Sequence, residues 1–304
     1  MTPPAAEART DAPSDAQWVR PDGVTIRWRV RRPPLPAAQR GAPLLLVHGL
    51  ASNATRFAEF CEQTSLAQRH VLAAVDLRGH GGSLTRTRVG MELWCDDLVA
   101  VLDAEGGAPA FVVGHSLGAQ VALHFAARRP ERVRGVVLID PVFRSALHGP
   151  WLRYAQAGPL FHAAAVLLRA LNALGLHRRQ LAPLDLRVLD EMARRSLADP
   201  AAEQAFIEQY SSFRADLKHL PLAVYLQDLV EMFAPAPRPR ELACPVLALL
   251  SAGATFADAT TMRAELQRPQ VHIETIDCHH WPLTERPREV REAVERWVAE
   301  RSVA

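Results

Sequence analysis

The sequence of 304 residues contains a single lysine, Lys218, so nearly all of its positive charge comes from arginine. Lys and Arg together exceed Asp and Glu by only two residues, which gives a formal net charge of +2. A charge this small does not indicate binding to nucleic acid or to an anionic membrane surface. We therefore expect no nucleic-acid partner and no membrane partner. The sequence leaves the oligomeric state open between a monomer and a homodimer.

Cysteine and long hydrophobic runs are also scarce. The cysteines are widely spaced and form no C-x-x-C pair, which predicts reduced thiols in a cytoplasmic protein. They are Cys61, Cys95, Cys244 and Cys278. The longest apolar candidate, residues 160–176, is interrupted by polar residues and does not predict a transmembrane helix. Residues 1–7 lack the apolar centre of a secretory signal.

Motifs for metals and dinucleotides are missing. The chain has no H-E-x-x-H pattern, no paired-cysteine spacing and no glycine fingerprint of a dinucleotide site. We therefore expect no metal and no cofactor.

Against these absences, one short motif stands out. Residues 114–118 read Gly-His-Ser-Leu-Gly, which fits the G-x-S-x-G turn that presents a nucleophilic serine. A short apolar run, residues 110–113, precedes the motif and predicts a buried strand. Residues 119–129 follow it and predict a helix that stops at Pro130. In this strand–turn–helix context, Ser116 is predicted to be a nucleophile rather than an incidental loop serine.

The remaining pattern predicts the fold class. Short apolar runs alternate with helical segments up to Asp140, which predicts an α/β protein with a mostly parallel sheet covered by helices on both faces. Residues 18–30 carry a hairpin signal, and residues 57–69 are predicted as one helix. Residues 141–240 show no strand pattern and are predicted as an inserted set of helices. Strand character resumes at residues 246–250 and 271–276, and a helix is predicted from Pro287 to about residue 301.

These predictions divide the chain into four parts. We expect a disordered tail over residues 1–15, a first core part over 16–140, a helical cap over 141–240 and a second core part over 241–304.

Four motifs in this order resemble those of the α/β-hydrolase family. They are His48-Gly49 after a strand, Asp76-Leu77-Arg78-Gly79-His80-Gly81-Gly82-Ser83, the serine motif and a C-terminal histidine motif. The resemblance covers most of residues 18–301, apart from the inserted helices. It implies a helical cap above the active site and a serine nucleophile.

The resemblance also implies an oxyanion hole. In the family, one backbone N–H comes from the segment after His-Gly and another from the residue after the nucleophile. The corresponding donors here are Leu50 and Leu117. Fixed N–H groups at these positions stabilise the negative charge of a tetrahedral intermediate.

The general base is implied by residues 278–287, Cys-His-His-Trp-Pro-Leu-Thr-Glu-Arg-Pro. This segment is similar to the family pattern of Gly-His-Trp-Pro followed by Glu and Pro. The alignment makes His280 the base, with His279 as the alternative. Glu285 and Pro287 match positions that open the last helix, so we interpret them as structural.

Three other histidines lie within the motifs: His48, His80 and His115. We interpret all three as structural, because they sit in the loops that shape the site.

The acid is where the sequence departs from the family pattern. The position that usually carries it is occupied by Ala254, and the next carboxylate is Asp258. Some family members place the acid after the strand that follows the serine helix, and Asp140 stands there. Because the C-terminal ends of parallel strands open onto the site, Asp140 is favoured and Asp258 is the alternative. A Ser–His dyad without an acid, or a protein without catalysis, also remains open.

The resemblance implies hydrolysis of a small-to-medium, mainly apolar carboxylic ester through an acyl-enzyme. Carbon–carbon bond hydrolysis, lactone or thioester hydrolysis and acyl transfer are alternatives on the same fold, and so is non-catalytic binding of a small ligand. In each case the partner is a small molecule.

The cap is expected to set specificity, through apolar and aromatic residues that share no obvious face. These are Phe143, Trp151, Tyr154, Phe161, Phe206, Tyr210, Phe213, Tyr225, Met232 and Phe233. Three arginines, Arg144, Arg153 and Arg214, are considered as partners for a substrate carboxylate, although each is first interpreted as exposed.

Overall fold

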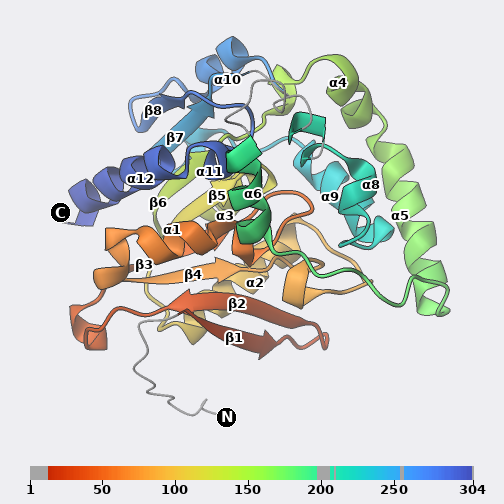
Figure 1. The fold of residues 1–304 in the computed structure, drawn as a ribbon, viewed down its shortest axis with the longest axis horizontal. Coiled ribbons are helices and arrows are strands. Elements are labelled where there is room, and N and C mark those ends of the chain that lie inside the picture. The colour runs from red at the N-terminus through yellow and green to blue at the C-terminus, as the bar shows by residue number, and fades with distance from the viewer. Residues whose placement is uncertain (1–12, 197–205, 209, 254–256, 303–304) are drawn as a thin grey trace.

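The computed structural model describes residues 13–196, 206–208, 210–253 and 257–302. Its centre is an eight-stranded sheet in the order β1-β2-β4-β3-β5-β6-β7-β8 (Figure 1). The strands are β1 Ser14–Val19, β2 Thr25–Arg31, β3 Gly41–Val47, β4 His70–Val75, β5 Ala110–His115, β6 Val133–Ile139, β7 Val246–Ser251 and β8 Val271–Ile276. β1 pairs with β2 and β2 with β4 in antiparallel fashion, and every other neighbouring pair is parallel.

Helices cover both faces of this sheet. On one face, α2 and α3 pack on the strands, and on the other face lie α1 and α12. Their bounds are α1 Ala58–Gln63, α2 Met91–Ala104, α3 Leu117–Arg128 and α12 Pro287–Ser302. The central strands are apolar on both sides because both faces are covered, and every residue of β4, β5 and β7 is buried.

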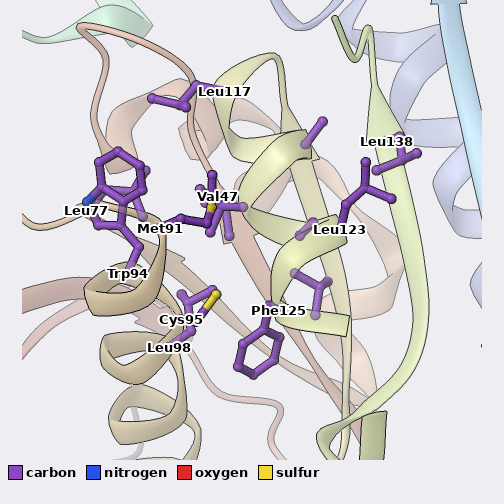
Figure 2. Close-up of a cluster of buried hydrophobic side chains, with 14 of the residues drawn as sticks. Val47, Leu77, Met91, Trp94, Cys95, Leu98, Leu117, Leu123, Phe125 and Leu138 are labelled. Carbon is purple, nitrogen blue, oxygen red and sulfur yellow. The ribbon is translucent and has the colours of Figure 1, made fainter. Parts of the chain in front are cut away.

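The face with α2 and α3 holds the larger core (Figure 2). Leu98 of α2 lies beside Phe125 of α3, and both side chains are fully buried. Trp94 of α2 is also fully buried, and its indole N–H donates to the carbonyl of Arg78 at 3.1 Å. Because α3 begins directly after Ser116, this packing fixes the helix whose N-terminus faces the site.

The segment between β6 and β7 is helical and lies over the C-terminal end of the parallel strands (Figure 1). Its α-helices in the described part of the chain include α4 Gly149–Gln156, α5 Gly158–Ala173, α6 Leu186–Ser196, α8 Phe213–Asp216 and α9 Leu222–Met232. The 3-10 turns of the chain are η1 Ala37–Gln39, η2 Ala54–Phe57, η3 Ser65–Gln68, η4 Gly81–Ser83, η5 Pro130–Arg132, η6 Arg144–Ala146 and η7 Pro239–Glu241. This arrangement confirms the predicted fold class, a mostly parallel sheet flanked by helices with a helical insertion.

Two sequence predictions about elements are corrected. Strand β1 begins at Ser14, so the expected disordered tail, residues 1–15, overlaps a strand, while residues 1–12 lie outside the described residues. The helix predicted over residues 57–69 is divided into α1 and η3, and its first residue is the end of η2. The break between α1 and η3 falls at Thr64, whose hydroxyl accepts the N–H of Leu66 and so competes with helix continuation.

Two short helices near the end of the chain complete the architecture. α10 Ala259–Leu266 follows β7, and α11 Pro282–Glu285 precedes α12. In the part of the chain that the structure describes, no helix combines the length and hydropathy needed to cross a membrane.

Candidate active site

Ser116 occupies a strained turn between β5 and α3. Its φ is +52°, in the left-handed region that a non-glycine residue rarely adopts. The backbone N–H of Ser116 donates to the carbonyl of Ile139, the last residue of β6, at 3.0 Å. The neighbouring strand therefore supports the turn, as expected where strain is kept at a functional position.

Two glycines allow this turn to form. A Cβ atom on Gly114 would lie 2.1 Å from the carbonyl oxygen of Gly118, and one on Gly118 would lie 2.1 Å from that of Val47. Both obstacles are backbone atoms, which cannot move aside like a flexible side chain. The serine turn therefore requires glycine at these two positions.

Three polar side chains meet at this turn in a hydrogen-bonded series. Nε2 of His280 lies 2.9 Å from Oγ of Ser116, and Nδ1 of His280 lies 2.5 Å from Oδ2 of Asp140. Ser116 and His280 are both buried. A serine, an imidazole and a carboxylate joined in this order match the geometry of a nucleophile, its base and the group that orients the base.

Asp140 is held for this contact by its backbone and by its second oxygen. Its φ is +43°, and its N–H donates to the carbonyl of Leu249 in β7 at 2.8 Å. Oδ1 accepts the backbone N–H of Ser251 at 2.9 Å, which leaves Oδ2 directed at His280.

The alternative acid has a different environment. Asp258 is exposed and caps the N-terminus of α10, where its side chain accepts the backbone N–H and the hydroxyl of Thr261, each at 2.7 Å. Ala254, the position that carries the acid in the family pattern, lies outside the described residues. Of the two candidate carboxylates, the structure brings Asp140 to His280.

The loop that carries His280 is organised by Glu285. Its carboxylate accepts the backbone N–H of His279 at 3.0 Å and that of Trp281 at 3.2 Å, one on each side of His280. Glu285 belongs to α11 and is buried. Its structural interpretation agrees with these contacts, and the imidazole that faces Ser116 belongs to His280, not to the alternative His279.

The histidines of the other motifs support the backbone around the site. Nε2 of His115 lies 3.0 Å from the carbonyl of His280. Nε2 of His48 accepts the N–H of Leu77 at 3.0 Å, so its Nδ1 donates to the carbonyl of Gly49 at 2.8 Å. Burial, followed by neighbouring positive charge, lowers the pKa of both His48 and His115 well below the usual histidine range.

His80 is further from the reacting groups. Its Nε2 lies 3.1 Å from Oδ2 of Asp228 in α9, and both side chains are almost fully buried. The pair joins the loop after β4 to the helical segment, in keeping with a structural role.

The two expected oxyanion donors flank Ser116. Leu117 is the first residue of α3, so its N–H belongs to the first turn, where helical N–H groups have no acceptor within the helix. Leu50 lies in the loop after β3 and lines the same cavity as Ser116.

A cavity of about 300 Å³ opens over Ser116 and His280. Its wall is mainly apolar, with Leu50, Val142, Leu147, Trp151, Leu184, Leu186, Leu189, Met232 and Phe233 among the lining residues. A cavity of this size is at the small end of the range for ligand sites.

The predicted cap residues divide between this cavity and helix packing. The cavity wall contains Trp151, Tyr210, Tyr225, Met232 and Phe233. It does not contain Phe143, Tyr154, Phe161, Phe206 or Phe213.

The three arginines considered for a substrate carboxylate are not part of the described cavity wall. Arg144 instead donates to the carbonyl of Phe233 at 3.0 Å. The arginine in the described wall is Arg56 of η2, which lies outside the sequence motifs of the site.

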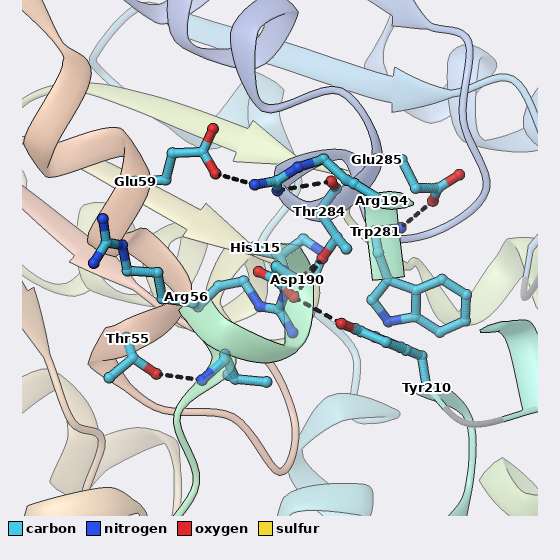
Figure 3. A network of polar contacts seen from close by, with 12 residues as sticks. Thr55, Arg56, Glu59, His115, Asp190, Arg194, Tyr210, Trp281, Thr284 and Glu285 are labelled. Carbon is cyan, nitrogen blue, oxygen red and sulfur yellow. Dashed lines mark hydrogen bonds and ion pairs between the residues drawn. The ribbon is translucent and has the colours of Figure 1, made fainter. Parts of the chain in front are cut away.

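Arg56 belongs to a buried polar network around Asp190 of α6 (Figure 3). Nη1 of Arg56 lies 2.7 Å from each carboxylate oxygen of Asp190. The hydroxyls of Tyr210 and Thr284 donate to Oδ1 of Asp190 at 2.9 and 3.0 Å. No local sequence pattern indicates this network, because Arg56 and Asp190 are 134 positions apart.

Asp216 is a carboxyl group of the cavity wall that no sequence pattern indicates. Burial raises the pKa of Asp216 to about 7, against a smaller lowering by its hydrogen bond with Tyr225. Among the described residues, no ion pair within 4.0 Å includes this carboxyl. Its charge therefore changes near neutral pH.

Comparison with known proteins agrees with the fold and the motifs. The sequence model of the alpha/beta hydrolase family matches residues 44–293. The chain is 44% identical to lipase LipV of Mycobacterium tuberculosis over 82 residues, which are 27% of this chain and 31% of the lipase. It is 35% identical over 126 residues to the pimeloyl-[acyl-carrier protein] methyl ester esterase of Chromobacterium violaceum, covering 41% of this chain and 47% of the esterase. The chain thus spans less than half the length of these two curated relatives.

Among solved structures, a thermophilic esterase from Thermogutta terrifontis superposes with a TM-score of 0.68. The superposition covers 95% of this chain and 99% of the esterase, at 21% sequence identity. At this level of identity, the likeness is one of fold.

Proposed function

Because the chain belongs to the α/β-hydrolase family, we propose that it is a serine hydrolase that cleaves a small-to-medium, mainly apolar carboxylic ester. The observation that carries this proposal is the series Ser116–His280–Asp140, which opens into a mainly apolar cavity.

In the first half of the reaction, Oγ of Ser116 attacks the ester carbonyl carbon while Nε2 of His280 takes the hydroxyl proton. The carbonyl oxygen becomes negative, and the N–H groups of Leu50 and Leu117 stabilise it. The tetrahedral intermediate then collapses. The bond to the alcohol breaks, His280 returns the proton to that alcohol, and the acyl group stays on Ser116.

In the second half, a water molecule takes the place of the alcohol. His280 accepts a proton from the water, which attacks the acyl carbon, and the proton then returns to Ser116 as the acid leaves. Asp140 orients His280 through Nδ1 and stabilises the imidazolium that forms in each half.

The substrate size follows from the cavity. A space of about 300 Å³ above Ser116 admits a short or medium acyl chain, and the apolar wall favours an uncharged one.

The test is a series of p-nitrophenyl esters of increasing acyl length, with Ser116→Ala as the matched control. We expect kcat/KM to rise through the short acyl chains and to fall once the chain exceeds the cavity. Hydrolysis by Ser116→Ala is expected to drop by at least about 10³-fold. A folded protein that binds these esters without hydrolysing them would favour the binding-protein alternative, and turnover confined to lactones or thioesters would change the substrate class.

A further inference from the structure

Asp190 is the one carboxylate at the centre of the network shown in Figure 3. Its side chain is only 7% exposed, yet it contacts three polar side chains. These are Arg56 at 2.7 Å, Tyr210 at 2.9 Å and Thr284 at 3.0 Å. So many contacts at one buried carboxylate go beyond what is needed to neutralise one arginine.

The partners of Asp190 come from both sides of the proposed site. Arg56 lies in η2, which follows the loop that contains Leu50. Thr284 lies in α11, four positions after His280. Asp190 itself comes from α6 of the helical segment, so one carboxylate joins the oxyanion loop, the histidine loop and the segment above them.

Two further hydrogen bonds hold the start of α6 against η2, each between a side chain and a backbone group. Nδ2 of Asn53 donates to the carbonyl of Leu184 at 2.8 Å, and the N–H of Leu186 donates to the hydroxyl of Thr55 at 2.9 Å. These two bonds place α6, and with it the backbone of Asp190, against the sheet domain independently of the Asp190 side chain.

Thr284 transmits this position to the histidine loop. Its backbone N–H donates to the carbonyl of Trp281 at 2.8 Å, and its hydroxyl also accepts from Nη1 of Arg56 at 2.5 Å. The Trp281 ring packs against His280 on one side, with centroids 5.8 Å apart, and against Tyr210, at 5.6 Å. Displacement of Thr284 or Tyr210 would therefore move the residue next to His280.

Asp190 also balances a charge in the cavity wall. Arg56 is 7% exposed and lines the cavity beside His280. Its positive charge contributes, after burial and the nearer histidines, to the lowered pKa of His48 and His115. The positive charge of Arg56 thus acts on these two imidazoles even though its guanidinium is paired with Asp190.

We propose that Asp190 is a positioning residue, which holds His280 in line with Ser116. The rate of the reaction would then depend on how the helical segment packs against the loops of the sheet. This inference rests on the proposed function for its kinetic consequence. The charged and titratable groups that surround the histidine are Asp140 after β6, His115 in β5, Arg56 in η2, Tyr210 and Asp190 in the helical segment, and Glu285 in α11.

The first test replaces Asp190 by asparagine, which keeps the shape and removes the charge. We expect kcat to fall by about 10- to 100-fold with KM nearly unchanged, because His280 is misplaced while the apolar wall remains.

Arg187→Gln is the matched control. Arg187 lies on the same helix and forms an exposed ion pair with Glu62 of the sheet domain at 2.7 Å, outside the network. We expect the kinetics of this variant to stay close to those of the unaltered protein. An equal loss of kcat in both variants would mean that any weakening of the packing of α6 on the sheet domain lowers activity. The specific role proposed for Asp190 would then be wrong.

A second pair of variants covers the case in which Asp190→Asn does not fold. Thr284→Val removes the hydroxyl at constant shape, and Thr284→Ser retains it. We expect the valine variant to reproduce the loss in kcat and the serine variant to stay within about threefold of the unaltered protein. Equal activity of the two would contradict the proposal.

The position of the His280 ring, followed through the NMR resonance of its Cε1 proton, separates this inference from the proposed function. At one fixed pH this resonance should shift or broaden in Asp190→Asn and stay unchanged in Arg187→Gln, whether or not the protein hydrolyses esters. An unchanged resonance in folded Asp190→Asn would overturn the role of Asp190, whereas absence of ester hydrolysis by the unaltered protein would overturn only the proposed function.

Discussion

At the scale of single residues, the two carboxylates Asp140 and Asp258 provide the sharpest comparison. Asp140 bonds to Nδ1 of His280, while Asp258 faces solvent and caps α10. We expect Asp140→Asn to lower kcat by about 10⁴-fold, because the amide no longer holds the imidazole in the required tautomer. Asp258→Asn should leave kcat unchanged and cost little stability, because asparagine is also a good N-cap. Steady-state kinetics on one activated ester checks both. Full activity of Asp140→Asn would return Asp258 or a dyad to consideration.

Asp216 predicts a pH dependence of substrate binding. The pKa of Asp216 is raised to about 7 by burial, so the carboxyl gains its charge as the pH rises through 7. A charge in a mainly apolar wall disfavours an uncharged ester, so KM should increase above pH 7 and should stay flat in Asp216→Asn.

Tyr225→Phe serves as the matched variant for this prediction. The hydrogen bond from Tyr225 lowers the pKa of Asp216, so its loss should move the increase in KM to higher pH. The raised pKa of Asp216 also affects stability. Because the folded pKa lies above the unfolded value of 3.8, the free energy of unfolding should fall as the pH rises from about 4 to about 7. Asp216→Asn should remove that fall. A KM that does not change across pH 7 would contradict the prediction.

The residues of the site differ in how well the sequence predicts them. Ser116 and His280 lie in contiguous motifs, and Asp140 follows a strand whose end must open onto the site. Asp190 and Asp216 have no such signal, because their surroundings form only when distant helices pack together. The role of each depends on burial and partners, which a linear sequence does not contain.

At the scale of elements, the serine turn predicts an intolerance that ordinary helix propensity does not. Alanine is a better helix former than glycine, yet Gly118→Ala should lower the free energy of unfolding by about 3 kcal/mol or more. The added Cβ would lie 2.1 Å from the backbone oxygen of Val47. Urea unfolding measures the change.

Gly158→Ala is the control for this prediction. Gly158 starts α5, and nothing lies within 4 Å of its added Cβ. We expect a change within about 1 kcal/mol, in the stabilising direction. Unfolding of Gly118→Ala and Gly158→Ala at the same urea concentration would contradict the prediction. It would mean that the serine turn has room for a Cβ atom at residue 118.

The elements themselves follow from the sequence where one strong signal decides them. β5 is a short apolar run, α3 ends before Pro130, and β8 coincides with the predicted strand. The single helix predicted over residues 57–69 is wrong, because the hydroxyl of Thr64 accepts the backbone N–H of Leu66 and ends α1 before η3. Such local competition depends on geometry that periodicity does not report.

At the scale of the whole molecule, the sheet and the inserted helices form one site. The sheet supplies Ser116, Asp140 and His280 from the ends of its strands and the loop after β8, and the helical segment supplies most of the cavity wall. The order of motifs along the sequence predicts that the sheet supplies the catalytic residues and that the inserted helices cover them. It does not predict which helical residues reach the cavity, because the helices between β6 and β7 carry apolar residues on more than one side.

The central claim is that His280 activates Ser116, and a fluorophosphonate probe tests it most directly. We expect intact-mass analysis to show one adduct and peptide mapping to place it on Ser116. Ser116→Ala should show no adduct, and His280→Ala should react much more slowly. A folded protein that remains unlabelled, or that carries the adduct on another residue, would contradict the account.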